Sequence, residues 1–346
     1  MLLVNNPGDW EHLYAPLAHA EWNGWTFTDL IFPFFLFIGG VSMALSLQRQ
    51  AQGGAARGAM LGKLLQRAAV IFMIGLALNL VPQFDFATLR IPGVLQRIAL
   101  CTALAAPLAI WCGWRALLAW IVALLAAYSV IMLKVPVPDP DGVLAAGALE
   151  PGRDVGAYVD RLLLSGHLWA KSRTWDPEGL FSTLPAVCSQ LFGVLAGRWL
   201  LAGRSRRAQC AALVLTGMLM LLAGSVLDVV LMPINKSLWT PSYSVFMTGW
   251  ALLLFAAFCW LLDVQGLTRW AQPLVIYGMN ALFIFAFSGL VARLLGYYHW
   301  KGALYAPLQA LPLAPAAASL LYAVLFNAVM FAVAWAMWRK RIFIKI

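Results

Sequence analysis

The stretch Thr28–Gln48, TDLIFPFFLFIGGVSMALSLQ, decides the fold class. It carries one charged residue, Asp29 at its start, and is otherwise apolar apart from a few small hydroxyl residues and the final amide. A helix needs about 20 such residues to cross a hydrocarbon core that is about 30 Å thick. The stretch does not alternate with a period of two, which favours a helix over a barrel strand. It therefore predicts a membrane-spanning α-helix.

Similar apolar stretches recur along the chain. Apolar residues make up 62% of the 346 residues, charged residues make up 11%, and the mean hydropathy is +0.81. A soluble domain cannot cover its surface with so few charges. We expect an all-α polytopic transmembrane helical bundle, a single domain over 1–346, in which Met1–Val4 is the last turn of a truncated first span. About nine complete spans are expected, near residues 28–48, 68–82, 93–112, 115–133, 180–202, 209–230, 243–262, 273–295 and 316–338.

Basic residues predict the orientation of the spans. They gather in alternate loops, which the positive-inside rule makes cytoplasmic, at Arg49, Arg57, Lys63, Arg67, Arg115, Arg198, Arg204, Arg206, Arg207, Arg269, Arg339, Lys340, Arg341 and Lys345. The intervening segments, including the long loop 134–179, should face the other side of a bacterial inner (cytoplasmic) membrane. The net charge of +10 is explained by this pattern, so no nucleic-acid partner is expected.

Metal and hydrolase chemistry have no support in the sequence. The five cysteines lie within or at the ends of apolar stretches without CxxC spacing, as small packing residues do. HExxH, P-loop, GxGxxG and GxSxG motifs are absent from the sequence. We expect no metal site.

The most informative residues are polar side chains at the predicted non-cytoplasmic ends of spans. His19 lies among aromatic residues in the segment before the first complete span, where a base with a near-neutral pKa can act chemically. Asp29 follows at a helix start, a position where the helix dipole favours a carboxylate. For His19 taken alone, a hydrogen-bonded interfacial histidine is the more ordinary interpretation.

Two further clusters carry charges. Arg97, in RIPGVLQR, lies more than a turn inside its span and should face a polar cavity or a carboxylate. Asp176 and Glu178 close the 134–179 loop, and a loop of this length is usually functional. A structural ion pair for Arg97 and simple solvation for the two carboxylates remain open.

A fourth cluster, PINKSLWTPSY at 233–243, contributes Asn235, Lys236 and Trp239. Asn280 in YGMN places one more amide inside a predicted span.

At these clusters the sequence resembles the heparan-α-glucosaminide N-acetyltransferase family. The matching stretches run in family order across essentially the whole chain: VNNPG at 4–8, HAEWNGWTFTDLIFPFFLF at 19–37, RIPGVLQR at 90–97, WDPEGLFSTLPA at 175–186, PINKSLWTPSY at 233–243, YGMN at 277–280 and the terminal RKRIFIKI. The resemblance implies a homodimeric membrane enzyme that takes acetyl from cytosolic acetyl-CoA and delivers it to a glucosamine amine across the membrane. It also implies that His19 matches the active-site histidine and Asn5 a nearby family asparagine.

Residue chemistry and resemblance together predict an acyltransferase acting on a periplasmic glycan or amino-sugar acceptor, at an amine or a hydroxyl. His19 would be a general base or a transiently acetylated nucleophile, and Asn5, Asn235 or Lys236 would stabilise the oxyanion. Arg49, Arg67 and Arg198 would hold the CoA phosphates on the cytoplasmic side. The expected acceptor-binding residues are Asp29, Arg97, Asp176, Glu178, Asn235, Lys236, Trp239 and Asn280.

A transporter or flippase for a sugar or lipid-linked intermediate is the alternative from another class. Arg97, Lys236 and Asn280 would then line a substrate path, although the sequence shows no internal repeat of the kind many transporters carry.

Overall fold

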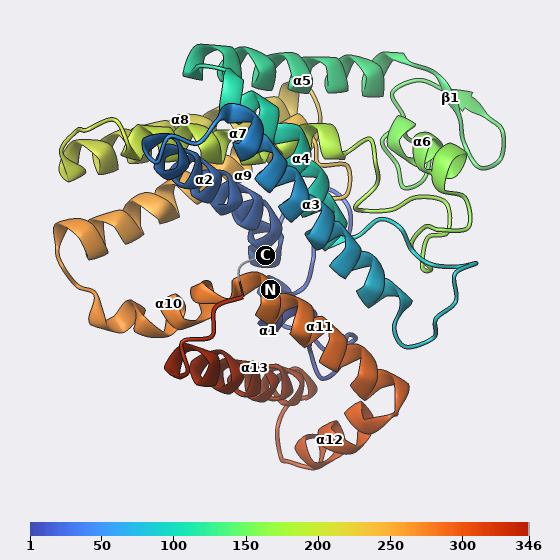
Figure 1. Ribbon diagram of the computed structural model, residues 1–346. Helices are drawn as coiled ribbons and strands as arrows, with labels where there is room; N and C mark the ends of the chain where they lie inside the picture. The colour runs from blue at the N-terminus through green and yellow to red at the C-terminus, as the bar shows by residue number, and fades with distance from the viewer. Residues whose placement is uncertain (345–346) are drawn as a thin grey trace.

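Long helices account for most of the computed structural model, which describes residues 1–344 (Figure 1). The long helices are α2 (Ile31–Gln52), α3 (Arg57–Leu80), α4 (Val94–Trp111), α5 (Trp114–Lys134), α7 (Thr183–Leu200), α8 (Arg206–Val230), α9 (Pro241–Cys259), α11 (Ala281–Tyr297) and α13 (Pro315–Arg339). Shorter helices are α1 (Leu2–Asn5), α6 (Val155–Leu164), α10 (Gln272–Met279) and α12 (Trp300–Gln309). The single helical turns are η1 (Ala15–Leu17), η2 (Phe27–Leu30), the π-helical η3 (Trp260–Val264) and η4 (Arg269–Ala271). The two short strands, β1 (Val137–Pro138) and β2 (Leu144–Ala145), pair antiparallel. The prediction of an all-α polytopic bundle is confirmed.

Fewer helices are apolar enough to cross a membrane than the nine expected. Within the described residues seven pass by length and hydropathy, or eight if the pair Arg269–Met279 and Ala281–Tyr297, which is bent by 67°, counts as one span. The expected span at 180–202 corresponds to α7, which is not among them. Polar residues such as Ser189 and Gln190 lower the hydropathy of α7, and both are buried by neighbouring helices.

α7 lies at the centre of the main helical group and contacts α2, α4, α5 and α9. Its approach to α2 is close because glycines face each other there. A Cβ atom on Gly193 would collide with the backbone carbonyl of Phe37, and one on Gly40 would collide with that of Gln190. Small residues that allow such contact are typical of helix pairs in membranes.

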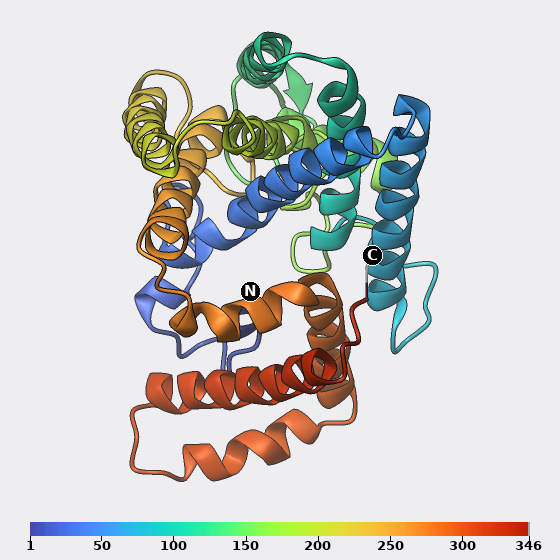
Figure 2. The same cartoon turned by 60° about the vertical axis from the view of Figure 1, so that its left-hand side comes forward.

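Helices α10 to α13 form a second group with its own core, centred on Ile284, Tyr322 and Phe326. Figure 2 shows this group lying beneath the main bundle, with α13 and α12 outermost. α1 packs against α13, and α11 contacts α3. The two groups are therefore joined by the first residues of the chain as well as by the link after α9.

The N-terminal ends of α2, α4, α7 and α9 meet at one end of the main bundle. Arg97 on α4 donates to the carbonyl of Gly179, just before α7, at 2.8 Å. Tyr243 on α9 donates to the carbonyl of Asp29, just before α2, at 2.7 Å. His19 and all but one of the predicted acceptor-binding residues are concentrated at this end; the exception is Asn280.

Candidate active site

Asp29 is the centre of the polar cluster at this end. It is the third residue of the short helix η2, and its Oδ2 accepts hydrogen bonds from the backbone amides of Thr26 and Ala20, each at 3.1 Å. The first of these bonds is half of a capping box, in which the third helical residue reaches back to the amide that precedes the helix. The side chain is only 1% exposed. The fold therefore holds the carboxylate in a fixed position with Oδ1 left for other partners.

His19 occupies that remaining oxygen. Its Nδ1 lies 2.6 Å from Oδ1 of Asp29, while 47% of the imidazole side chain is exposed. A separation of 2.6 Å between a ring nitrogen and a carboxylate oxygen requires a proton between them, so Nδ1 carries the hydrogen. Nε2 then presents its lone pair, and it makes no hydrogen bond within residues 1–344. A carboxylate that fixes the tautomer in this way prepares Nε2 to act as a base or a nucleophile.

Lys236 completes the cluster from a distant part of the chain. Its Nζ lies 3.2 Å from Oδ1 of Asp29 and 3.0 Å from Nδ1 of His19. Since Nδ1 donates to Asp29, the ammonium bonds to the carboxylate and only approaches the ring. Burial lowers the pKa of Lys236, although the carboxylates of Asp29 and Glu178 oppose that effect.

Asn235 positions Lys236 by fixing the loop between α8 and α9. Its Oδ1 accepts the amide of Leu238 at 2.9 Å, and its Nδ2 donates to Oδ1 of Asn23 at 3.2 Å. Asn23 and Asn235 also form an antiparallel bridge, and Asn235 is fully buried. The amide is thus occupied in joining the loop of Lys236 to the loop of His19.

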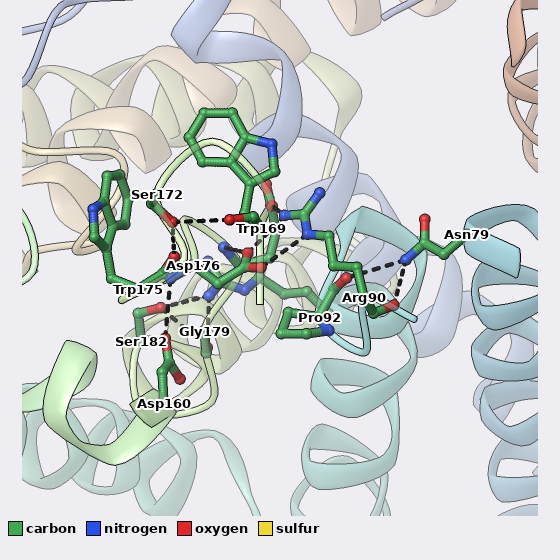
Figure 3. Close-up of polar contacts among 12 residues, drawn as sticks. Asn79, Arg90, Pro92, Asp160, Trp169, Ser172, Trp175, Asp176, Gly179 and Ser182 are labelled. Carbon is green, nitrogen blue, oxygen red and sulfur yellow. Dashed lines mark hydrogen bonds and ion pairs between the residues drawn. The ribbon is translucent and has the colours of Figure 1, made fainter. Parts of the chain in front are cut away.

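Asp176 and Glu178 lie in a second cluster, beside the first, with Arg90 as their common partner. Figure 3 shows the side chains of Arg90 and Asp176 pointing toward each other. The guanidinium of Arg90 binds Asp176 through two bonds, at 2.8 and 2.6 Å, and Glu178 at 2.6 Å. Burial alone would lower the pKa of Arg90, but these carboxylates raise it above its usual value. Asp176 is inaccessible to solvent, whereas Glu178 is 13% exposed, so Glu178 is the carboxylate that a ligand could reach.

Asp160 on α6 holds the backbone of the same loop through hydrogen bonds. Its carboxylate accepts the backbone amides of Asp176 at 3.2 Å and Leu180 at 3.0 Å. Burial, with a smaller contribution from the charge of Asp176, raises the pKa of Asp160 to about 7 despite the two amide bonds.

Arg97 and Trp239 are buried together behind these clusters. Arg97 donates to the carbonyl of Gly179 and to the hydroxyl of Ser182, and its guanidinium lies 5.3 Å from the centre of the Trp239 ring. Each residue is 1% exposed, and the indole of Trp239 donates to Ser189 at 3.1 Å. Within residues 1–344, Nε and one terminal nitrogen of Arg97 have no hydrogen-bond partner.

A cavity of about 430 Å³ separates α2, α3, α4 and α7 from the break between α10 and α11. Arg67 and Asn280 both line it, as do Gln190 and Thr102, which share a 3.3 Å hydrogen bond. The side chain of Asn280 binds the backbone of Ile342 and of residue 344, at 3.0 and 2.9 Å. The cavity therefore lies between the two helical groups.

The remaining predicted residues lie apart from these clusters. Asn5 ends α1, is exposed, and makes no side-chain hydrogen bond within the described part of the chain. Arg49 is exposed near the end of α2. Arg198 donates to the carbonyls of Ala109 and Cys112, at 2.6 and 2.9 Å, and so caps the C-terminus of α4.

Two residues of the site were missed by sequence reasoning. Arg90 lies in RIPGVLQR, in which the sequence pattern points only to Arg97, and Asp160 lies within the loop 134–179, in which it points only to Asp176 and Glu178. The signal for Arg90 was an unpaired cation at the same predicted membrane face as WDPEG. Among residues 1–344, no three His, Cys, Asp or Glu side chains come together in an arrangement that could hold a metal ion.

Comparison with known proteins identifies the family of the chain. The family model described as heparan-alpha-glucosaminide N-acetyltransferase, catalytic, matches residues 9–223, which include His19, Asp29, Arg90 and Asp176. The chain is 28% identical over 341 residues to the heparan-alpha-glucosaminide N-acetyltransferases of Homo sapiens and Mus musculus. Each alignment covers 82% of this chain and 50% of the relative, so the chain spans about half the length of these relatives. Since the family model matches well over half of the residues, the chain belongs to the heparan-alpha-glucosaminide N-acetyltransferase family.

Proposed function

We propose that the protein is a membrane-embedded acetyltransferase that moves acetyl from acetyl-CoA to the amine or hydroxyl of a sugar on the opposite face of the membrane. The observation that carries this proposal is the pairing of half-exposed His19 with buried Asp29 at one end of the helical bundle. We further propose that the protein is a homodimer in a bacterial cytoplasmic membrane, with the His19 end facing the periplasm.

In the direct reaction, Nε2 of His19 removes the proton from the acceptor amine or hydroxyl as it attacks the thioester carbonyl. A C–N or C–O bond forms, the C–S bond breaks, and the proton passes from the imidazolium to the departing thiolate. In the two-step version, Nε2 itself attacks the thioester carbonyl and the C–S bond breaks to release the CoA thiolate. The acceptor then attacks the acetyl group, the bond from that group to Nε2 breaks, and the acceptor proton passes through the freed Nε2 to the thiolate. Both versions begin from the tautomer that Asp29 fixes.

Asp29 has an electrostatic role in both versions. Its buried carboxylate stabilises the positive charge that appears on the ring when Nε2 gains a proton or an acetyl group. Lys236 brings a cation within 3.0 Å of the ring and can favour negative charge on the oxygen of the tetrahedral intermediate. Asn5 and Asn235 are the further candidates for that oxygen, although the amide of Asn235 is already occupied.

On the acceptor side, Glu178 is placed to receive hydrogen bonds from a sugar. Asp176 and Arg90 hold it in position, and Arg97 fixes the backbone of the same loop at Gly179. Trp239 and Asn280 act through packing and loop position, since both are buried.

On the donor side, the cavity lined by Arg67 is the preferred route for acetyl-CoA. A polyanion needs cations near the cytoplasmic face, and Arg67 combines an exposed side chain with access to a cavity that contains polar groups. Arg49 can add to the surface charge, whereas two donors of Arg198 are already bonded to carbonyls.

The test uses purified protein in proteoliposomes with labelled acetyl-CoA and a panel of amino sugars and neutral sugars. His19→Ala should abolish transfer and leave acetyl-CoA binding intact, because a base or nucleophile acts on the chemical step. Mass spectrometry of acid-quenched protein separates the two versions, since only the two-step reaction leaves acetyl on His19.

His12→Ala is the matched control. His12 lies in the same loop and also pairs with an aspartate, with Nδ1 2.7 Å from Oδ2 of Asp9, but neither side chain is buried. It should keep most of the activity. Transfer at the normal rate by the His19 variant would contradict the proposal, and wild-type protein that moves a sugar across the bilayer without binding acetyl-CoA would favour a transporter.

A further inference from the structure

A groove of about 680 Å³ runs between α5, α7, α8 and α9, at the end of the bundle opposite His19. Its walls are mostly apolar side chains, including Leu118, Phe192, Leu213 and Met220. The volume is within the range of about 300–1,000 Å³ that is usual for ligand sites. Because these helices belong to a membrane protein, an apolar ligand can enter from the bilayer.

Two arginines lie over tryptophans that line this groove. The guanidinium of Arg115 is 5.2 Å from the centre of the Trp114 ring, and that of Arg204 is 5.4 Å from the centre of the Trp199 ring. Neither arginine forms a salt bridge within the part of the chain that the structure describes, and both are exposed. The mouth of the groove therefore presents two cations with no anionic partner.

One donor at the groove also lacks a partner. Nε1 of Trp199 is buried and makes no hydrogen bond within residues 1–344. An indole N–H usually finds an acceptor when it is buried. A ligand with acceptor oxygens next to an apolar chain would supply one.

We propose that this groove binds an anionic phospholipid from the leaflet at the basic face of the protein. An acyl chain lies along the apolar walls, and the phosphate lies between Arg115 and Arg204. Basic pockets between membrane helices on the cytoplasmic side recognise such headgroups. The tryptophans suit the depth of the interface.

Charge favours a lipid over a second copy of the chain in this groove. A two-fold interface brings the same patch of both copies together, so each pair of arginines would face the other pair. Like charges in contact oppose association. The phospholipid proposal does not depend on the acetyltransferase proposal, because lipid binding is measured without acetyl-CoA or acceptor.

Native mass spectrometry of protein purified in mild detergent tests the proposal. After delipidation, titration with phosphatidylglycerol should refill one tight site, and phosphatidylcholine should bind more weakly. The double variant Arg115→Gln/Arg204→Gln should bind phosphatidylglycerol about thirtyfold more weakly, since each basic residue near the membrane surface contributes about 1 kcal/mol.

Arg269→Gln/Arg339→Gln is the matched control. It removes the same charge from the basic face, and Arg339 also lies over a tryptophan, Trp335, at 5.3 Å, but Trp335 does not line the groove, whereas Trp114 and Trp199 do. This variant should bind phosphatidylglycerol as the wild type does. Equal binding of the two lipids, or an equal loss in both double variants, would overturn the proposal.

A photo-crosslinking residue in place of Leu118 gives an independent readout. Leu118 on α5 is 40% exposed and lines the groove. Val229, near the C-terminal end of α8, is 84% exposed and does not line the groove. In membranes the probe at 118 should give a phospholipid adduct enriched in anionic headgroups, relative to the probe at 229. A crosslink from residue 118 to a second copy of the chain would show that the groove is a protein interface and contradict the proposal.

Discussion

At the scale of single residues, one carboxylate organises the candidate active site. Oδ2 of Asp29 is held by two backbone amides, and Oδ1 receives His19 and Lys236. The carboxylate is buried and the imidazole is half exposed, so the fixed partner lies inside and the reactive edge of the ring lies outside. The surface pair of His12 and Asp9 lacks this burial, which is why we expect no catalytic role for it.

Asp29→Asn tests the orientation of His19. The amide keeps the size of the side chain, but it can present an N–H to Nδ1 and so favour the tautomer in which Nε2 carries the hydrogen. Acetyl transfer should fall by about 10²–10⁴-fold, the range for loss of general-base catalysis, with acetyl-CoA affinity changed little. Measurement of kcat and of donor affinity in the same preparation checks this, and an unaltered kcat would show that Asp29 serves only the helix cap.

At the scale of elements, the loop before α7 is held from several sides. Arg90, between α3 and α4, binds its two carboxylates, Arg97 on α4 binds its backbone, and Asp160 on α6 accepts its amides. Such convergence explains how a connection outside the long helices can hold Glu178 in a fixed place.

The pKa of Asp160 makes stability depend on pH in a defined direction. The value of about 7 in the folded protein exceeds the value of about 3.9 expected in an unfolded chain. The folded protein therefore binds more protons between these values, and its stability falls as pH rises from about 4 to 7 and then levels off.

Asp160→Asn should remove this share of the pH dependence, because an amide does not titrate. Thermal unfolding in detergent between pH 5 and 8, followed by circular dichroism, compares the two proteins. As pH rises over this interval, the melting temperature of the wild type should fall more than that of the variant. Parallel curves would show that Asp160 titrates below pH 5.

The contact between α2 and α7 gives a prediction about packing. A methyl group at Gly193 would collide with the carbonyl of Phe37, so Gly193→Ala should destabilise the protein by about 1–3 kcal/mol, the usual cost of overpacking. On α3, Gly62 has no atom within 4 Å of the equivalent position, and Gly62→Ala should leave stability unchanged or slightly higher. Melting temperatures of the two variants provide the comparison, and equal values would contradict the close approach.

At the scale of the whole molecule, orientation in the membrane determines what the site can reach. Reporter fusions at residues 55, 205 and 345 should be cytoplasmic, and fusions at 150 and 305 should lie on the other side, because basic residues gather in alternate loops. Residue 345 lies outside the described residues. A cytoplasmic signal from residue 150 would place Asp176 and Glu178 on the wrong face for a periplasmic acceptor.

The architecture could be predicted from the sequence further than the site could. Hydropathy predicts the helices, because lipid requires each span to bond its own backbone. The helix α7 is less apolar than a lipid-facing span because protein, not lipid, surrounds its Ser189 and Gln190. His19 and Asp29 could be predicted as site residues from their chemistry, their position and, for His19, the family resemblance. The approach of Lys236 to His19, 217 residues away in the sequence, and the pairing of Arg90 with Asp176 depend on how distant helices pack, which local patterns do not encode.

The distance along the chain between His19 and Lys236 has a consequence for biosynthesis. A ribosome adds about 5–20 residues per second, so roughly 10–40 s separate the synthesis of the two residues. During that interval α2 to α8 are made, but the segment 235–243, which supplies Lys236 and the bond from Tyr243 to the Asp29 carbonyl, has not yet emerged. A nascent chain therefore inserts most of its helices while His19 and Asp29 still lack Lys236, and the complete cluster can form only once synthesis has reached α9.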